Sequence, residues 1–389
     1  MNVFRNLGLI AAFSALAAPS YAAAAADPCA AIAALSARSD ASASKELIAA
    51  ITGTDPKAQA CAVRAAGETK NAAAAEALLA NVKSYLAARG PYEDNLQLRL
   101  NALDSIWSLG EIGDPAAMKE LLALYAGSDD TIKINIVLGA GKAPLAETAG
   151  FLYKIAGSGK EASVVRAAAY EALAGLNAAM PAASLSAAEG MDPGDLVYSG
   201  GIFALPLNAI NELPVGHSGI YGGVEIIDGK LAMVIYDCVP DHFKPYGGSR
   251  RIYSYKNFTH QNKYPFYGNR TSAARPTAAQ RRLIIKAAAA LMGHHYSDTH
   301  FSQKGPADFD CVGYTEAAYE AAGLNPTPDE YETGWGWPLT PSEQFDFTVS
   351  NVRRGAPALP YREPGTEARL TELLDANAAA LTNAFGLIK

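Results

Sequence analysis

The feature that most constrains the fold is a change in the spacing of apolar residues near residue 180. From about residue 27 to 180 nearly the whole sequence has helical periodicity with short breaks, whereas the alternation after residue 193 is typical of strands. Residues 181–193, with two prolines and a Ser/Ala stretch, are typical of a linker. A chain of 389 residues is long enough for two or three domains. The sequence therefore predicts a multidomain protein, all-α at its N-terminal side and α+β at its C-terminal side.

The helical part contains an imperfect repeat. Its best copy lies within residues 97–125, and weaker copies begin at Ala62 and Val164. Each copy reads as a helix, a turn rich in Gly, Asp and Pro, and a second helix. Such a pair cannot bury its apolar face alone, so successive pairs are expected to stack. The pattern resembles short HEAT-like repeats over residues 55–180. It implies a HEAT-like solenoid over 27–180, which is either a docking surface for a protein partner or a cap that supports the next domain.

Strand signals dominate the next part of the chain. Residues 195–198 are expected to form a short strand, and residues 217–227 and 231–237 flank the dipeptide Asp228-Gly229. This dipeptide is a strong hairpin turn signal. The sequence therefore predicts an antiparallel sheet.

Residues 308–323 hold a cysteine with a candidate chemical role. A turn leads into a helical pattern that stops at Gly323, so Cys311 is expected in the first turn of a helix. The positive end of the helix dipole favours a thiolate, which is the nucleophilic form of cysteine. The alternative is a small buried core cysteine.

A thiol nucleophile needs a base, and His217 is the best candidate. It begins a predicted strand and is flanked by Gly216 and Gly219, which leave room for the imidazole. The imidazole takes the thiol proton and later returns it to the leaving group. Tyr236 and Asp237, on the return strand, are candidates for orienting the imidazole. Because they point to opposite faces, only one can face His217, and Asp237 is favoured because a carboxylate stabilises an imidazolium.

Several segments together resemble a known family. Residues 293–296 and 310–314 resemble the Gly-x-x-Tyr and Asp-Cys-Ser-Gly segments of NlpC-type papain-fold cysteine peptidases. Residues 194–198 and 216–221 resemble two strands of that family. Here the histidine precedes the cysteine, an order that resembles the circularly permuted branch, which includes YiiX-like proteins. The resemblance covers roughly residues 190–350.

The resemblance implies a permuted papain-like (NlpC) catalytic domain over 194–360, with Cys311 as nucleophile and His217 as base. The main-chain N–H of Cys311 and the side chain of Tyr296 would form the oxyanion site. Strict alignment puts the third catalytic position at Tyr236, although a one-residue shift would bring Asp237 there. Val312 stands where the family usually has serine.

The same mechanism implies no cofactor and no metal. His294, His295 and His300 match no standard metal-ligand spacing and are expected on loops or the surface. Trp335 and Trp337 either wall the substrate cleft or belong to the core.

Residues 242–297 lack Asp and Glu but carry many cationic and aromatic side chains. Such a stretch suggests an anionic partner, for instance the carboxylates of a peptide or cell-wall polymer; the alternative is a solvated face. The net charge of -7 gives no case for nucleic acid.

Residues 1–25 resemble a secretory signal peptide, which predicts a periplasmic or secreted protein without a membrane span. In an oxidising compartment, Cys29 and Cys61 are expected to form a disulfide, whereas Cys238 is expected to be a buried free thiol. Residues 361–389 are expected to form a C-terminal helix.

These expectations combine into a cysteine peptidase or amidase that cleaves an amide bond, most simply in cell-wall (peptidoglycan) peptides, through an acyl-enzyme. One alternative is a lipid or thioester acyl hydrolase or acyltransferase of the permuted branch, because the same Cys–His pair serves that chemistry. The other alternative is a non-catalytic binding protein that works through its helical solenoid.

Overall fold

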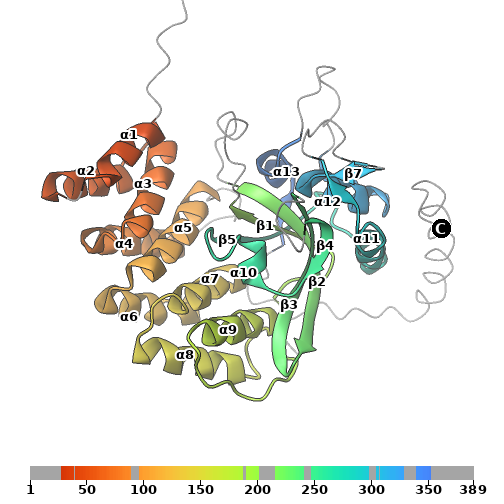
Figure 1. Ribbon diagram of the computed structural model, residues 1–389, viewed down its shortest axis with the longest axis horizontal. Coiled ribbons are helices and arrows are strands. Elements are labelled where there is room, and N and C mark those ends of the chain that lie inside the picture. Colours follow the sequence, from red (N-terminus) through yellow and green to blue (C-terminus); the bar gives the residue numbers. More distant parts are fainter. Residues whose placement is uncertain are drawn as a thin grey trace, which may run out of the picture.

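The computed structural model (Figure 1) describes residues 28–38, 40–88, 96–186, 190–200, 215–240, 247–297, 304–305, 307–327 and 339–351. Within these ranges the protein combines thirteen α-helices with an antiparallel sheet, so it is a mixed helix-and-sheet protein. The predicted signal peptide and the predicted helix over 361–389 lie outside the described residues. None of the helices in the described ranges is both long enough and apolar enough to cross a membrane.

Nine of these helices precede the sheet and are called the helical layer. Their bounds are α1 Pro28–Ser36, α2 Ala41–Ile51, α3 Pro56–Glu68, α4 Ala75–Ala87, α5 Leu96–Ile112, α6 Pro115–Ala123, α7 Asp130–Ala140, α8 Ala146–Gly157 and α9 Ser163–Gly175. Short 3-10 turns cover Ala72–Ala74 and Tyr125–Gly127.

Aspartates start several of these helices. The side chains of Asp55, Asp114 and Asp129 each accept a hydrogen bond from a backbone N–H in the first turn of the helix that follows. Proline occupies an early position of α3 and α6, where a missing N–H costs nothing. The Gly-Asp-Pro turns of the sequence repeat thus become helix starts.

The helices α3, α5, α7 and α9 pack one against the next and are called the inner row. Close contact between neighbours depends on glycine. A Cβ at Gly67 of α3 would lie 2.7 Å from Ser108 Oγ of α5, and a Cβ at Gly110 of α5 would lie 2.7 Å from Gly139 O of α7. Larger side chains at these positions would separate the helices.

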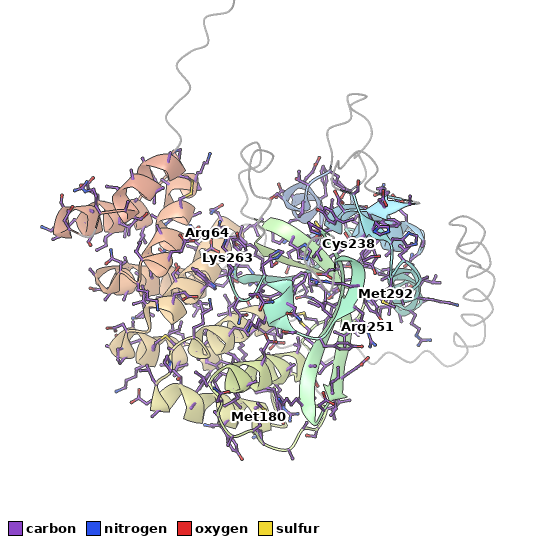
Figure 2. All side chains as sticks on the ribbon, in the orientation of Figure 1. Arg64, Met180, Cys238, Arg251, Lys263 and Met292 are labelled. Carbon is purple, nitrogen blue, oxygen red and sulfur yellow. A yellow bond between two sulfur atoms is a disulfide. The ribbon has the colours of Figure 1, made fainter. Side chains whose placement is uncertain are left out.

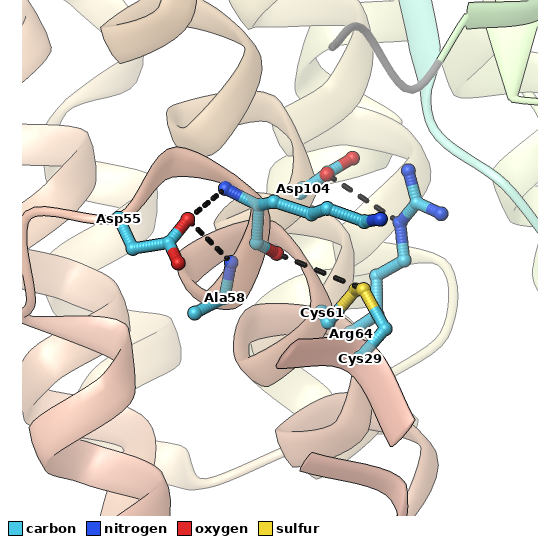
Figure 3. The surroundings of a disulfide bond; sticks show 7 residues. Cys29, Asp55, Ala58, Cys61, Arg64 and Asp104 are labelled. Atoms are coloured by element: carbon cyan, nitrogen blue, oxygen red, sulfur yellow. Dashed lines mark hydrogen bonds and ion pairs between the residues drawn. A yellow bond between two sulfur atoms is a disulfide. The ribbon is translucent and has the colours of Figure 1, made fainter. Parts of the chain in front are cut away.

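A disulfide ties the first helix to the inner row (Figure 3). It joins Cys29 of α1 to Cys61 of α3, with the two Cα atoms 5.4 Å apart, and this is the pair that the sequence predicts. Arg64, one turn further along α3, forms an ion pair at 3.5 Å with Asp104 of α5.

The sheet has six strands in the order β4-β3-β2-β1-β5-β8, and every neighbouring pair is antiparallel. The strands are β1 Leu196–Gly200, β2 Val215–Ile227, β3 Lys230–Val239, β4 Gly248–Ile252, β5 Phe266–Thr271 and β8 Val349–Ser350. Two short strands, β6 His295–Tyr296 and β7 Asp308–Phe309, form a separate parallel pair.

The remaining helices are α10 Tyr255–Phe258, α11 Ala278–Ala290, α12 Cys311–Glu320 and α13 Pro341–Phe347. Figure 1 shows the sheet between the helical layer on one side and α11, α12 and α13 on the other. Helix α12 packs on β2 and β3, while α9 packs on β3 and α7 on β5. The sheet is therefore covered by helices that lie far apart in the sequence.

The predicted linker is attached to the helical layer where it is described. Arg166 of α9 donates to the carbonyl of Ser184 at 2.6 Å, and the Tyr170 hydroxyl donates to the carbonyl of Pro181 at 2.9 Å. These contacts fix residues 181–186 along α9, so this part of the connection is packed and not a free tether.

Candidate active site

The β2–β3 hairpin brings His217 and Asp237 together. Gly219 of β2 lies opposite Asp237 of β3. Since residues two apart in a strand share a face, the side chains of His217 and Asp237 lie on the same face. His217 Nε2 is 3.0 Å from Asp237 Oδ2, and both side chains are buried.

Gly219 is the position between them, and its lack of a side chain matters. A Cβ there would lie 2.9 Å from Ile235 Cγ2 and 3.0 Å from a ring atom of Phe258. The Phe258 ring uses this space to lie against His217, with the two ring centroids 5.0 Å apart. Glycine thus allows an aromatic side chain to support the imidazole.

Arg250 of β4 keeps Asp237 ionised. Arg250 Nε donates to Asp237 Oδ1 at 2.8 Å, and Nη2 donates to Oδ2 at 3.2 Å. Burial raises the pKa of Asp237, but the charge of Arg250 and the hydrogen bonds from His217 and Arg250 outweigh it and lower the pKa to about 2. An ionised carboxylate can only accept, so His217 Nε2 carries the proton. Nδ1 of neutral His217 is then unprotonated and is the atom that can act as a base.

Tyr236 does not orient His217, and the alternative that gave it this role is wrong. Tyr236 lies opposite Ile220, on the other face of the strand pair, where the Arg251 guanidinium is 5.8 Å from its ring centroid. The register shift in β2 between Tyr221 and Gly223 explains the difference. Counting back from the Asp228-Gly229 turn without a shift would put Tyr236 on the face of His217, and the shift puts Asp237 there.

Cys311 is the first residue of α12, as predicted, and its thiol lies beside β2. The Asp310 side chain caps the helix by accepting from the backbone N–H of Gly313 at 2.7 Å. The backbone N–H of Ser218, the neighbour of His217, lies close enough to the Cys311 thiol to lower its pKa, although burial has the larger, opposite effect. Helix α12, which begins with Cys311, packs on β2 and β3, the strands that carry His217 and Asp237.

The thiol is not an activated thiolate in the resting protein. Burial raises the pKa of Cys311 well above its usual range, and the Asp310 carboxylate raises it further. Hydrogen bonds from the backbone N–H groups of Ser218 and Val312 act in the opposite direction but are weaker. The position of Cys311 at a helix N-terminus predicts a lowered thiol pKa. Burial outweighs this effect of the helix dipole, because only 7% of Cys311 is exposed, and the Asp310 carboxylate that caps the helix opposes it as well.

Two further residues of this site were missed by the sequence analysis. In the sequence, Arg250 is one of many cations within residues 242–297, and no motif contains His260. The His260 ring centroid lies 5.1 Å from that of His217. Burial, and then repulsion from His217 when that ring is protonated, lower the pKa of His260 to about 3, so the His260 imidazole is neutral near pH 7. No local pattern distinguishes His260, because its position depends on distant parts of the chain.

Much of the cationic stretch is matched by carboxylates from elsewhere in the protein. Besides Arg250, Arg251 pairs with Glu225 and Arg281 pairs with Asp195. Arg270 is buried and donates to the backbone carbonyl of Thr348. These guanidinium groups therefore hold the fold together, and the case for an anionic partner at this stretch is weaker than the sequence suggests.

The other predicted positions are partly described. Tyr296 is buried in β6, next to β7, which ends two residues before Cys311. Cys238 is a buried free thiol whose Sγ donates to the carbonyl of Phe309 at 3.2 Å; it is labelled in Figure 2. Trp335 and Trp337 lie outside the described residues.

The described residues contain no group of three His, Cys, Asp or Glu side chains that could hold a metal ion. His294 is part of a loop, where its Nδ1 lies 3.2 Å from the carbonyl of Ala307, and His295 is exposed in β6. His300 is outside the described ranges.

No family model, curated protein or solved structure matches the chain. The function proposed below accordingly comes from the residues, their geometry and the motif resemblance.

Proposed function

We propose that the protein is a cysteine hydrolase that cleaves an amide bond through an acyl-enzyme on Cys311. The observation that carries this proposal is the contact of His217 Nε2 with the ionised Asp237 carboxylate at 3.0 Å, beside a helix that begins with Cys311. This contact leaves His217 Nδ1 free of a proton, and in this proposal Nδ1 takes the proton of the Cys311 thiol.

The reaction would begin with a neutral thiol, because burial raises the pKa of Cys311. As Sγ attacks the carbonyl carbon of the substrate, the thiol proton passes to His217 Nδ1. The oxyanion would be held by the backbone N–H of Cys311 and by Tyr296. The imidazolium then gives its proton to the departing amine, which leaves a thioester. Water, activated by His217, attacks the thioester carbon, releases the acid and restores the thiol.

We also propose the finer assignment of the fold. Support for a permuted papain-like domain comes from a cysteine-initiated helix that packs on an antiparallel sheet, with the histidine strand earlier in the chain. Support for HEAT-like repeats comes from the successive packing of α3, α5, α7 and α9. In this proposal the inner row supports the sheet, since its helices contact β3 and β5.

The proposed substrates are cell-wall peptides outside the cytoplasm. This part rests on the sequence resemblance to NlpC-type peptidases and on the signal-like residues 1–25. Purified peptidoglycan incubated with the protein should release peptide fragments with new amino termini, detected by mass spectrometry. Cys311→Ala should release none. Cys238→Ala, which removes the other buried free thiol, is the matched control and should retain activity.

The raised pKa of Cys311 favours one other candidate, a non-catalytic protein in which Cys311 is a structural thiol. Release of the same fragments by Cys311→Ala would refute the role of Cys311 as nucleophile. No release by the wild-type protein from peptidoglycan or from lipids would support this non-catalytic candidate. The lipid or thioester alternative shares the Cys–His pair, so acylated lipid substrates should be assayed in parallel. Turnover of lipids without turnover of peptidoglycan would reassign the substrate class.

A further inference from the structure

A segment between the helical layer and His217 connects the two parts of the protein. This bridging segment, residues 254–268, contains α10 and the start of β5. It supplies the two rings that contact His217, those of Phe258 and His260. Whatever holds the bridging segment in place therefore also holds the surroundings of the proposed base.

The inner row binds both ends of the bridging segment. Glu171 of α9 accepts from the backbone N–H of Tyr255 at 2.8 Å, at the start of α10. Asn135 of α7 bonds to both the N–H and the carbonyl of Phe266. The Tyr267 hydroxyl donates to Asp104 of α5 at 2.8 Å and accepts from Arg64 of α3. Figure 2 labels Arg64 on the side of the helical layer that faces the sheet.

The middle of the bridging segment is a turn that needs outside support. His260, Gln261 and Asn262 have φ values of 51°, 64° and 59°, a left-handed conformation that residues other than glycine rarely adopt three times in succession. Such a conformation persists only where surrounding contacts impose it.

Two donors from the helical layer provide that support. Trp107 Nε1 donates to the carbonyl of Asn262 at 3.0 Å, and Lys142 Nζ donates to the same carbonyl at 2.7 Å. The two donors also contact each other, with Lys142 Nζ 4.2 Å from the Trp107 ring centroid. A pocket lies at this junction, lined by Trp107 and Lys142 on one side and by Asn262 and Tyr264 on the other. The two hydrogen bonds add to those within the turn itself, where Thr259 Oγ1 donates to Asn262 Oδ1 at 3.3 Å and the Gln261 N–H donates to the carbonyl of Lys256 at 2.6 Å.

We propose that His260 is a positioning residue of the active site and that the helical layer holds it against His217 through the bonds of Trp107 and Lys142 to Asn262. The inference rests on the proposed function of His217 as base. Together with Phe258, His260 packs against the His217 ring, so that Nε2 stays on Asp237 and Nδ1 stays available to the thiol. The helical layer is then part of the catalytic device, in addition to being a cover for the sheet.

The test measures Cys311 alone and needs no substrate. The probe is iodoacetamide at pH 8, and peptide mass spectrometry follows the alkylation rate at Cys311 separately from that at Cys238. Lys142→Met and Trp107→Phe each remove one donor to Asn262 and keep most of the side-chain volume. We expect these two variants and His260→Ala to lower the His217-dependent part of the alkylation rate about 10-fold. The reason is that a small displacement of the base from the thiol slows proton transfer strongly. His260→Phe should keep most of the rate, because it retains a neutral ring.

Lys133→Met is the matched control. Lys133 lies in α7, and Lys142 follows the end of that helix. Lys133 forms an ion pair with Glu161 at 3.0 Å and lies over the Tyr125 ring, much as Lys142 pairs with Glu111 and lies over the Trp107 ring. No contact joins Lys133 to the bridging segment among the interactions described. Its variant should lose a similar ion pair and leave the alkylation rate unchanged.

A double-mutant cycle separates positioning from general loss of stability. If Lys142 acts through the turn that holds His260, Lys142→Met combined with His260→Ala should be no slower than the slower single variant. Additive effects would overturn the proposed connection, as would wild-type rates in Lys142→Met and Trp107→Phe. A His260→Phe variant as slow as His260→Ala would overturn the positioning role.

The dependence of the alkylation rate on His217 shows whether the role of the helical layer alone is refuted or the proposed function as well. If His217→Ala leaves the wild-type alkylation rate unchanged, His217 is not the base and both proposals fall. If the rate depends on His217 but not on Lys142, Trp107 or His260, the hydrolase proposal stands and only the role of the helical layer is refuted.

Discussion

Replacing Asp237 by asparagine tests the centre of the proposed site. The change removes one negative charge from a fully buried position and keeps the size of the side chain. It breaks the ion pair between Asp237 and the Arg250 guanidinium, whose side chain is only 16% exposed. It also allows the amide to donate to His217 Nε2, which would move the imidazole proton to Nδ1 and remove the base.

The structure sets the size of the effect on stability. A fall in the pKa of Asp237 from 3.8 to about 2 corresponds to about 2 kcal/mol of folding free energy at neutral pH, at about 1.4 kcal/mol per pKa unit. Because the folded-state pKa is depressed, this contribution is complete above about pH 4 and disappears as the pH falls towards 2. The loss of the Arg250–Asp237 ion pair adds a further cost, so we expect Asp237→Asn to lose about 3 kcal/mol.

Denaturant unfolding between pH 2 and pH 7 gives the free energy of unfolding, and iodoacetamide gives the reactivity of Cys311. Asp195→Asn is the matched control, since Asp195 is also fully buried and paired with an arginine, Arg281. Burial raises the pKa of Asp195, so its charge opposes folding, and its replacement should cost less. It should also leave the alkylation of Cys311 unchanged, whereas Asp237→Asn should remove the dependence on His217.

Two results would refute this reasoning. Equal losses of stability for the two asparagine variants would mean that the Arg250 ion pair does not stabilise the site. Unchanged, His217-dependent alkylation in Asp237→Asn would mean that Asp237 does not set the proton position on His217. The acid limb of the stability curve is an independent check: in Asp237→Asn, the dependence on pH between about 4 and 2 should become weaker.

Three further predictions concern neighbouring features. Asp310→Asn keeps a side chain that can cap α12 but removes the anion that raises the pKa of Cys311, so alkylation at pH 7 should become several-fold faster; a slower rate would contradict the assigned cause. Gly219→Ala places a methyl group 2.9 Å from Ile235 and 3.0 Å from Phe258, so it should destabilise the protein by about 1–3 kcal/mol and slow the alkylation of Cys311. Gly127→Ala is the control, because its methyl group would meet nothing within 4 Å and should change neither quantity. Cys29→Ser opens the disulfide whose cysteines are 32 residues apart and should lower the free energy of unfolding by about 3 kcal/mol, measured by denaturant unfolding, while alkylation of Cys311 by iodoacetamide in the folded protein stays unchanged.

The parts of the fold that were predictable depend on short-range signals. The Gly-Asp-Pro turns mark the starts of helices because aspartate caps and proline fits the first turn. The Asp228-Gly229 turn marks the hairpin, and the helix pattern after Asp310 puts Cys311 in the first turn of α12. Each of these signals lies within a few residues of the structure that it predicts.

The features that were missed depend on partners far away in the sequence. The left-handed turn at His260 is held by Trp107, which is 155 residues from Asn262, and by Lys142, which is 120 residues away. The raised pKa of Cys311 depends on burial by the assembled protein. The pairing of Arg250 with Asp237 requires the register between β3 and β4. No window of sequence contains these relations.

The choice between Tyr236 and Asp237 shows how small the deciding feature can be. Both strands of the hairpin and its turn are visible in the sequence, and strict alternation from that turn assigns Tyr236 to the face of His217. A single irregularity between Tyr221 and Gly223 shifts the register by one residue and reverses the assignment. Gly223 has a φ of 114°, and a Cβ at Gly222 would lie 2.9 Å from the Tyr236 ring, so the two glycines make the irregularity possible. The identity of the orienting group therefore depends on two residues that have no side chain, more than ten positions from the aspartate that they bring into place.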